Sequence, residues 1–526
     1  MFAHSFAVFN NRLIRDAVEG FPDDGRLTAI AVGLYAAILF VLSLYGGHRY
    51  TLLINYWRSR RGQPKPLRNF GEAELPGVVV QLPLFNEQYV VEGLLDAVCR
   101  LDYPRDRLQI QVLDDSVDET RGIASSACAA WRARGLDVSY IHRADRSGYK
   151  AGALENGLKT AKFGLVAIFD ADFRPEPDFL RRAVHHFSDE RVAVVQGRWG
   201  HLNGEDSLLT RVQTIMLDGH FLVEHPARNR SGKFFNFNGT AGLWRIAAIH
   251  DAGGWHHETL TEDLDLSYRA QLKGWRFVYD PELICPAELP VEMNAFKSQQ
   301  HRWAKGSVQV MRKVLGRVLR SDAPLSVKTE AFFHLTGNLA YLLMLGMCVL
   351  TLPVMAARAR VVDPWLGGLV DAGMFVMATA SVVAFYTVAQ MLGYRDWKDR
   401  IGAVPMMLAV GIGLTVNQAK AVVEALVGHR TGFVRTPKYA QGAEGAGAWV
   451  QKRYRGVRNW VPMLELVFAV YFTVVVGYAV SRGLYGALPF LLLFFTGFWY
   501  VSLMSLFQGR WARVATPSAP PRPAAA

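Results

Sequence analysis

The chain of 526 residues divides into long apolar runs and one charged segment, and this division limits what it can fold into. The runs lie before about residue 58 and after about residue 320. Several extend over about twenty residues, which is enough to cross a hydrocarbon core of roughly 30 Å. The segment between them has the charge density of a soluble protein. We therefore predict a multi-pass membrane protein with one domain outside the bilayer.

The regions predicted from this division are an N-terminal segment 1–26, a transmembrane helix 27–48, a domain 72–298, an interfacial amphipathic helix 299–325, transmembrane helices within 330–508 that enclose a cytosolic loop 428–460, and a disordered tail 509–526. Residues 49–71 are basic and contain prolines, so a linker along the membrane surface is expected there. The apolar runs of the second half cover residues 332–357, 365–392, 401–427, 462–481 and 486–507.

Basic residues account for the net charge of +12, and they crowd beside the apolar runs, as at residues 58–61, 312–320 and 453–458. Lys and Arg in such places mark the cytosolic side of a membrane and contact anionic lipids. A nucleic-acid-binding protein would instead carry aromatic residues among basic clusters on a soluble fold. Membrane lipids are therefore predicted partners, and nucleic acid is not.

The run 401–427 decides the predicted topology. If it crossed the membrane, the basic residues 429–458 would lie outside, against the preference of Lys and Arg for the cytosolic side. The second half of the run contains Asn417, Gln418, Lys420 and Glu424. We therefore predict a re-entrant or interfacial segment here and five membrane spans in all. Six spans are the alternative that hydropathy alone gives.

The charged segment alternates between apolar runs and stretches with helical spacing. Strands are expected at residues 77–84, 108–113, 138–142, 163–169 and 192–196, with helices at 91–100, 119–134, 150–162 and 178–187. Such alternation with short connections predicts an α/β domain with a doubly wound, mostly parallel sheet. Ligands of these sheets bind at the carboxyl ends of the strands.

Acidic residues stand at two of these strand ends. Asp114 and Asp115 end the second strand, and Asp170-Ala171-Asp172 follows the fourth. Two carboxylates one residue apart can hold a hard divalent cation. A strand-end turn with solvated acids is the alternative, because Asp is common in turns.

A third acidic group is Thr261-Glu262-Asp263. Asp263 could serve as a general base for an acceptor hydroxyl. A helix start, with Thr261 as N-cap and acids in the first turn, explains the same residues. Both interpretations can hold together.

Two glycine-containing segments could also contribute to a site. Residues 147–152 run into a helix whose first amides, with Lys150, could meet a phosphate, although a plain turn is the simpler interpretation. Residues 237–242 are polar and could hydrogen-bond a sugar, with a hairpin turn as the alternative.

The pentad Gln299-Gln300-His301-Arg302-Trp303 lies at the junction with the membrane part. Gln299 and Arg302 share one face of a helix, because they are three residues apart. Arg302 can bind a diphosphate bidentately, and Trp303 offers a flat surface for a sugar ring. Taken alone, the pentad is better explained as an amphipathic surface helix with a Trp at the membrane interface.

In this order, the acidic groups and the Gln-x-x-Arg-Trp pattern resemble the membrane-embedded family-2 glycosyltransferases: cellulose, hyaluronan and chitin synthases. The chain is most similar to the glucomannan-type branch of the cellulose synthase-like proteins and their bacterial relatives. The resemblance covers about residues 75–310 and rests on residues 81–87, 112–116, 148–152, 235–242, 261–263 and 299–303.

The resemblance implies a GT-A-type nucleotide-sugar-binding domain inserted between transmembrane helices. It implies a processive, inverting hexosyltransferase that makes a β-linked polysaccharide of β-glucan or glucomannan type and extrudes it across the membrane. UDP-glucose is the favoured donor. The alternatives are a GDP-mannose-dependent mannan synthase and a non-processive enzyme that adds one sugar to a lipid. The expected location is the bacterial inner membrane, with the domain in the cytosol.

The resemblance also implies roles for single residues. Asp170 and Asp172 would hold Mg²⁺ or Mn²⁺, and Asp263 would be the catalytic base. Asp114 or Asp115 would contact the nucleoside, with Asp115 counted among the catalytic residues. The further substrate-binding residues are Lys150, Asp170, Glu262, Gln299, Arg302 and Trp303. Residues 433–438 resemble the gating loop of cellulose synthases in part, but Arg435 stands where that pattern has Val.

Overall fold

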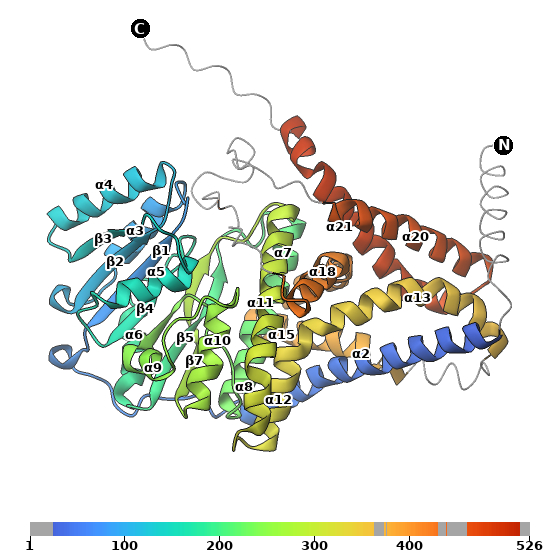
Figure 1. Ribbon diagram of the computed structural model, residues 1–526, viewed down its shortest axis with the longest axis horizontal. Helices are drawn as coiled ribbons and strands as arrows, with labels where there is room; N and C mark the ends of the chain where they lie inside the picture. Colours follow the sequence, from blue (N-terminus) through green and yellow to red (C-terminus); the bar gives the residue numbers. More distant parts are fainter. Residues whose placement is uncertain (1–24, 362–372, 375, 430–437, 439–459, 516–526) are drawn as a thin grey trace, which may run out of the picture.

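The computed structural model describes residues 25–361, 373–374, 376–429, 438 and 460–515. Most of the predicted N-terminal segment, nearly all of the loop 428–460 and the last part of the predicted tail therefore lie outside the described residues. An α/β domain occupies one end of the molecule and long helices occupy the other (Figure 1).

In the described part of the chain, seven strands form one sheet in the order β3-β2-β1-β4-β6-β5-β7. They are β1 (Val78–Leu84), β2 (Leu108–Asp114), β3 (Val138–His142), β4 (Leu165–Ile168), β5 (Val192–His201), β6 (Gly242–Arg245) and β7 (Arg276–Ala287). Only β6 runs antiparallel to its neighbours among these strands. The predicted α/β class with a mostly parallel sheet is confirmed.

Helices cover both faces of the sheet: α3 (Val91–Cys99), α4 (Thr120–Ala133), α5 (Tyr149–Leu158), α6 (Phe179–Val184), α9 (Ile246–Asp251) and α10 (Glu262–Leu272). Alternate residues of β1 pack into two hydrophobic cores, one on each face of the sheet. Val80 packs with Leu94 of α3, while Val79 packs with Leu154 of α5. Since both faces are covered, the strands read as continuous apolar runs.

The five predicted strands are confirmed with small shifts at their ends, except that β5 extends five residues beyond the expected end at residue 196. Strands β6 and β7 were not predicted. Strand β6 has four residues, and β7 contains two prolines and pairs with β5 through a register shift. These features break the alternation by which a strand is recognised.

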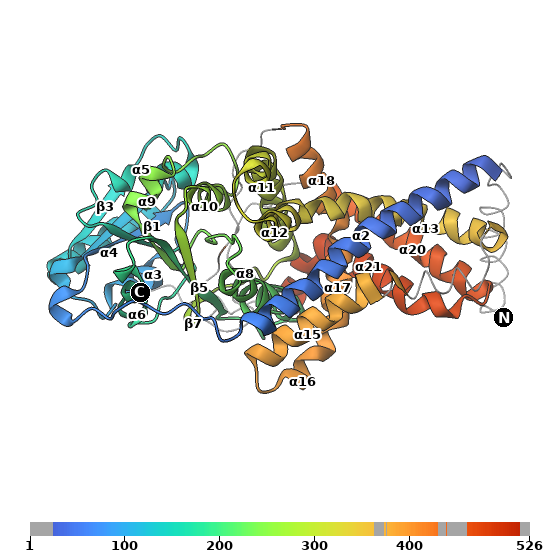
Figure 2. The same ribbon diagram turned by 90° about the horizontal axis from the view of Figure 1, so that it is seen from below.

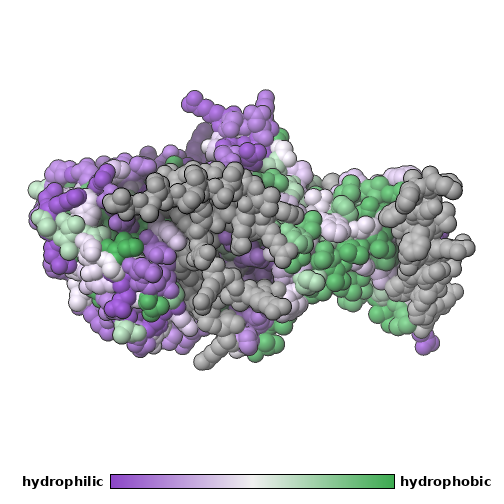
Figure 3. All heavy atoms as spheres, turned by 90° about the horizontal axis from the view of Figure 1, so that it is seen from above, coloured by the Kyte–Doolittle hydropathy of each residue, from purple (hydrophilic) through white to green (hydrophobic). Residues whose placement is uncertain are grey.

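Within the described residues, five helical stretches are long and apolar enough to cross a membrane. They are Gly25–Ser59 (α2), Leu325–Ala357 (α12 and most of α13), Val376–Gly393 (η6 and α15), Val461–Ser481 (α20) and Tyr485–Gln508 (η9 and part of α21). Apolar side chains gather on the surface of this helical end (Figure 3). The prediction of a membrane protein is confirmed.

The run 401–427 forms two helices, α17 (Val404–Gly413) and α18 (Thr415–Leu426). Together with the turn of helix before α17, they make a pair bent by 45°, which is either a broken span or a re-entrant segment. The polar residues of α18 face the protein: Asn417 donates to the carbonyl of Lys297, and Glu424 accepts from Lys305. Five spans and six both fit this arrangement.

Helix α2 runs to Ser59 and includes residues 49–59, which were predicted to be a linker. The correction has a packing cause. Leu52 and Leu53 are buried against residues of α8 (His225–Arg230), of the preceding π-helix η4 (Gly219–Glu224) and of α15 (Ser381–Gly393). Tertiary packing thus continues the helix beyond its apolar run, and α2 extends from the far end of the molecule to the domain (Figure 2).

Helix α11 (Met293–Arg320) begins before the pentad, so Gln299 lies in its second turn and not in its first. Val310, Val314 and Val318 are buried together with Leu264 and Leu335, which belong to α10 and to α12 (Leu325–Thr336). The amphipathic pattern of residues 299–320 therefore reflects packing within the protein, whereas the sequence had placed this face on the bilayer. Helix α7 (Leu208–Asp218) leads into η4.

Candidate active site

A cavity opens at the carboxyl ends of β1, β2 and β4, where the sequence predicted a ligand. It is lined by nearly all of the predicted site residues: Asp115, Lys150, Asp170, Asp172, Glu262, Asp263, Gln299, Arg302 and Trp303. The structure therefore brings together side chains from the sheet, from α5, from α10 and from α11. Asp114 does not line the cavity.

The two acids that end β2 have different surroundings. Asp114 is fully buried, and its oxygens accept hydrogen bonds from the Ser116 amide (2.8 Å) and the Tyr140 hydroxyl (2.7 Å). Asp115 lines the cavity, and Arg143 donates to both of its oxygens (2.8 and 2.5 Å). A carboxylate held on both oxygens suits a binding role better than proton transfer. Asp114 supports the strand end.

Asp170 and Asp172 lie directly after β4, each with a lysine beside it. Lys150 Nζ is 2.5 Å from Asp170 Oδ1, and Lys438 Nζ contacts Asp172 Oδ2. Asp170 and Glu262 raise the pKa of Lys150 although its burial acts in the opposite direction, so this lysine stays cationic. Both carboxylates thus face a position that already favours positive charge.

The two carboxylates fit the metal that the resemblance implies. Carboxylate oxygens are hard donors, and Mg²⁺ is commonly held by one or two carboxylates together with waters and substrate phosphates. Within the described ranges, no group of three or more His, Cys, Asp or Glu side chains could hold a metal ion. Asp170 and Asp172 would therefore share the ion with a substrate diphosphate.

Glu262 and Asp263 lie in the first turn of α10, directly after Thr261. Both acid groups are partly buried and line the cavity. Burial and the neighbouring Glu262 raise the pKa of Asp263 to about 7, and burial likewise raises the pKa of Glu262. Asp263 Oδ1 also accepts from the Leu264 amide (2.8 Å). A carboxylate poised near neutral pH suits general base catalysis.

Helix α11 brings Gln299, Arg302 and Trp303 to the same cavity. Partial burial lowers the pKa of Arg302 below its ordinary value, and the charges of Glu262 and Asp170 oppose this shift. The ring of Trp303 lies 6.3 Å from that of Trp199, centroid to centroid. The helix therefore provides a cation and a flat aromatic surface opposite the acidic strand ends.

A second cavity adjoins the first and lies between the domain and the membrane helices. Asp263, Asn238, Gln299 and Trp303 line both cavities. Its walls combine apolar and aromatic side chains with polar ones: Gln213, His220, Glu224, Asn236, Gln300, Ser307, His334, Asn338 and Gln418. Such a lining suits a ligand rich in hydroxyl groups.

The segment before β6 contributes Asn238 and Gly239 to the site. It follows α8 and not a strand, so the hairpin considered for residues 237–242 is not formed. The carbonyl of Gly239 accepts from Lys150 Nζ (3.0 Å), and the Thr240 hydroxyl accepts from the Asp170 amide (2.9 Å). The segment thus holds Lys150 and Asp170 in place.

Several cavity residues were not singled out from the sequence: Glu87, Arg146, Trp199, His201 and Glu288. Trp199 and His201 lie on the extension of β5, and continued alternation beyond residue 196 is a signal that could have indicated them. Arg146, whose guanidinium lies 3.3 Å from the Phe85 ring centroid, follows β3. Its partner comes from another strand end, which no local pattern reveals.

Gly306 of α11 sets the distance between α11 and the start of α10. A Cβ atom at this position would lie 2.5 Å from Thr261 Cγ2 and 2.9 Å from the Thr261 amide nitrogen. We expect Gly306→Ala to push Thr261 and Asp263 away and to lower kcat by about 10²-fold, as a displacement of about 1 Å can. Initial rates with purified protein measure this.

Gly316→Ala is the matched control on the same helix. A Cβ atom there meets only the flexible end of Arg320, at 3.7 Å. This variant should keep wild-type kcat and gain about 0.5–1 kcal/mol of stability, because Ala favours a helix interior over Gly. Equal kcat in both variants would contradict the tight packing at Gly306.

In a comparison with known protein families, residues 76–306 match the family model described as "Glycosyltransferase like family 2". The chain is 43% identical over 298 residues to glucomannan 4-beta-mannosyltransferase 2 of Arabidopsis thaliana, covering 55% of this chain and 56% of that protein. It is 45% identical over 258 residues to glucomannan 4-beta-mannosyltransferase 1 of Oryza sativa subsp. japonica, covering 48% and 49%. The chain thus spans about half the length of these relatives.

Among solved structures, the chain is similar to the mannosyltransferase PcManGT from Pyrobaculum calidifontis in complex with GDP-Man and Mn2+. The TM-score is 0.51 at 21% identity, and the match covers 75% of this chain and 100% of that one. This likeness shows a shared fold and confirms the GT-A-like architecture of the sheet.

Proposed function

We propose that the chain is a membrane-bound hexosyltransferase that builds a β-linked polysaccharide from a nucleotide sugar. Residues 76–306 match a family-2 glycosyltransferase model, and the relatives are named as glucomannan mannosyltransferases, which supports the proposal. One observation carries the proposal. The cavity joins two carboxylates at a strand end, the guanidinium of Arg302, and the Asp263 carboxylate, whose pKa is raised to about 7. Inverting sugar transfer needs this combination: a place for a diphosphate and a base for the acceptor.

The donor lies across the strand ends in the proposed complex. Asp115 and Arg146 line the part of the cavity where they would contact the nucleoside, and Asp170 and Asp172 are the residues that would hold the divalent ion. The ion, Mg²⁺ or Mn²⁺, supplies Lewis-acid stabilisation of the leaving diphosphate. Arg302 donates to the same diphosphate from the opposite wall.

The acceptor approaches from the second cavity. Asp263 lines both cavities, so it can take the proton of an acceptor hydroxyl as that oxygen attacks the anomeric carbon. A single displacement of this kind inverts the configuration. The position of the second cavity between the domain and the membrane helices supports a growing saccharide as acceptor, and a lipid-linked sugar is the alternative occupant.

GDP-mannose is the donor that we propose, in place of the UDP-glucose favoured from the sequence. The curated relatives are named as glucomannan mannosyltransferases, and a glucomannan-type product agrees with that. We further propose that the domain lies on the cytosolic side of a bacterial inner membrane, because Lys and Arg beside membrane spans favour the cytosolic side.

A panel of nucleotide sugars tests the function. Purified protein in lipid vesicles is incubated with labelled GDP-mannose, GDP-glucose, UDP-glucose or UDP-N-acetylglucosamine, with Mn²⁺ or Mg²⁺ and with chelator. The expected result is a metal-dependent, β-mannosidase-sensitive polymer from GDP-mannose. A single lipid-linked sugar would refute the polymerase, and turnover of UDP-glucose alone would refute the donor.

The pH dependence of kcat/KM should show the ionisation of the catalytic base, Asp263. Because Asp263 must be deprotonated and its pKa is raised to about 7, kcat/KM should fall as the pH drops through this value, by about tenfold per unit. Initial rates from pH 5 to 9 measure this limb. A flat profile down to pH 5 would contradict the raised pKa.

Trp303→Ala should separate chain elongation from donor chemistry. The ring lines both cavities, so it can offer its flat face to a sugar of the growing chain. We expect short products with hydrolysis of the donor retained, measured by product size. Trp57→Ala, at an exposed position of α2, is the control. Loss of folding in Trp303→Ala would favour a purely structural role.

A further inference from the structure

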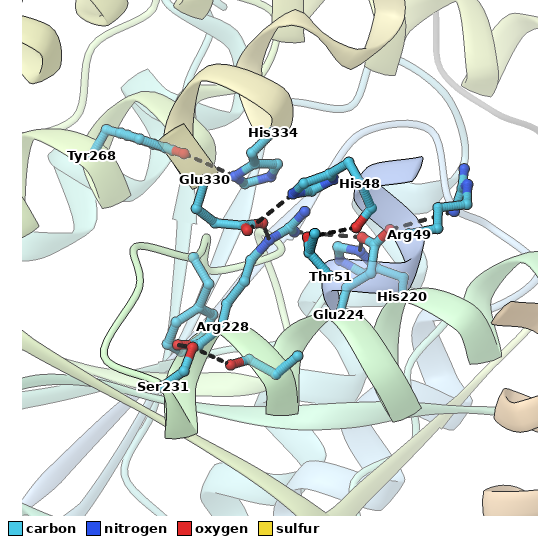
Figure 4. A network of polar contacts seen from close by, with 12 residues as sticks. His48, Arg49, Thr51, His220, Glu224, Arg228, Ser231, Tyr268, Glu330 and His334 are labelled. Atoms are coloured by element: carbon cyan, nitrogen blue, oxygen red, sulfur yellow. Dashed lines mark hydrogen bonds and ion pairs between the residues drawn. The ribbon is translucent and has the colours of Figure 1, made fainter. Parts of the chain in front are cut away.

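A network of polar side chains joins the first membrane helix to the domain (Figure 4). Arg228, Tyr268 and Glu330 are buried, and the network reaches the second cavity through His220, Glu224 and His334. Its members come from α2, from η4 and α8, from α10 and from α12. The labelled residues are His48, Arg49, Thr51, His220, Glu224, Arg228, Ser231, Tyr268, Glu330 and His334. Charged groups buried in this way must be paired to be tolerated.

On the membrane side of the network, Glu330 and Glu224 each contact basic side chains, and Arg228 contacts both of these carboxylates. His48 Nε2 of α2 lies 3.0 Å from Glu330 Oε2, and Arg228 Nε donates to Glu330 Oε1 (2.9 Å). Arg228 Nη1 is 3.4 Å from Glu224 Oε2, and Arg49 Nη1 is 3.8 Å from Glu224 Oε1. Two guanidinium groups thus balance two carboxylates, with the side chains of Arg228 and Glu330 only 4% and 5% exposed.

The site side of the network ends at the Asn238 side chain. Asn238 Oδ1 lies 2.6 Å from His225 Nε2, and Asn238 Nδ2 lies 2.8 Å from His220 Nε2. His220 Nδ1 lies 3.0 Å from Glu224 Oε2. Burial would raise the pKa of Glu224, but Arg228 and His220 hold it well below its ordinary value, so this group is a carboxylate.

With the Asn238 amide in this orientation, the contacts determine which nitrogen of His220 and of His225 donates a hydrogen bond. Glu224 can only accept, so His220 carries its proton on Nδ1 and accepts from the Asn238 amide at Nε2. His225 then donates from Nε2 to Asn238 Oδ1. Burial lowers the pKa of His225 well below its ordinary value, which agrees with a neutral imidazole. The amide of Asn238 is therefore clamped on both sides.

The clamp is one residue away from the reacting groups. Gly239 has φ +83°, and its carbonyl accepts from Lys150, which pairs with Asp170. A Cβ atom at Gly239 would lie 2.9 Å from Asp263 Oδ2. A shift of the Asn238–Gly239 peptide would therefore displace Lys150 and crowd Asp263 at the same time.

We propose that His220 is a positioning residue: it holds Asn238, and through it Lys150, Asp170 and Asp263, in a geometry that depends on the docking of α2 onto the domain. The inference rests on the proposed function. It makes His48 and Arg49 of the membrane helix part of the support of the active site, although neither lines either cavity. Support of this kind tunes the groups that touch substrate.

The first experiment compares His220→Leu with His220→Gln in the full chain. Leu removes both hydrogen bonds, whereas Gln keeps an acceptor for the Asn238 amide. His220→Leu should lower kcat about 10- to 100-fold, as small misplacements of reacting groups do, with a much smaller change in the donor KM, and His220→Gln should regain most of the loss. Amide hydrogen exchange of residues 236–242 should be faster in His220→Leu than in the wild type.

The second experiment starts at the far end of the network and does not require His220 variants to fold. His48→Leu should also speed exchange in residues 236–242. Tyr45→Phe is the matched control, because it removes another hydrogen bond between α2 and α12, to Thr336 (3.0 Å), outside the network. It should leave both exchange and kcat unchanged.

Unchanged exchange of residues 236–242 in His220→Leu and His48→Leu would overturn the inference, even if the enzyme makes the proposed polymer. Faster exchange in both, with Tyr45→Phe unaffected, would support it even if the donor differs from GDP-mannose. A wild-type protein that turns over no nucleotide sugar would overturn the proposed function, and the exchange experiment would still decide the positioning role.

Discussion

Asp263→Asn is expected to lower kcat by about 10²–10⁴-fold, the range that a general base contributes, while binding of the nucleoside diphosphate stays close to wild type. Asn keeps the size of the side chain and can still accept from the Leu264 amide, so α10 should begin as before. It cannot take the proton of an acceptor hydroxyl. Steady-state rates and calorimetric binding of GDP with Mn²⁺ measure the two effects separately.

Asp251→Asn is the control for Asp263→Asn. It makes the same chemical change at an exposed carboxylate of the same domain, which accepts from Trp275 and lies outside the cavity. Its kcat should stay within about twofold of wild type, since surface substitutions away from a site change little. Retained turnover in Asp263→Asn would show that another group removes the acceptor proton.

Arg302→Met should cost about 10²–10³-fold in kcat, the usual loss when one donor to a developing anion is removed. Met keeps much of the length of the side chain and can occupy the buried volume. The charge and the planar fork that meet the diphosphate are lost, so GDP should also bind more weakly. Arg302→Lys should recover only part of the rate, because an ammonium group cannot bind bidentately.

The control for Arg302→Met is Arg317→Met, four turns further along α11 at an exposed position. It removes the same charge from the same helix without touching the cavity. Equal losses in both variants would indicate a general effect of charge near the membrane. A loss confined to Arg302→Met would assign the effect to the diphosphate.

The strand ends of the domain could be predicted because β4 is an apolar run and β1 and β2 are mostly apolar runs, with polar residues at or soon after the end of each. The sequence alone therefore predicts that Asp115, Asp170 and Asp172 lie at one edge of the sheet. Strand β7 could not be found in this way. Its pairing with β5 shifts register after Gly197, and Pro281 and Pro286 interrupt its pattern.

Side-chain partners in the site depended on contacts between distant segments. The sequence separates Arg143 from Asp115 by 28 residues and Lys438 from Asp172 by 266 residues. No local period carries this information, because it arises from how strands and helices meet in space. The same limit applied to α11, whose amphipathic face matched a bilayer and a protein core equally well.

Helix α2 has a consequence for how the protein can be divided. His48 and Glu330 are 282 residues apart in the chain, so their contact closes only after both membrane helices have been synthesised. A fragment of residues 72–298 would leave Arg228 without Glu330 and Glu224 without Arg49. Buried charges that lose a partner destabilise a fold strongly. The catalytic unit of this protein is therefore not the soluble-looking segment but that segment together with its flanking spans.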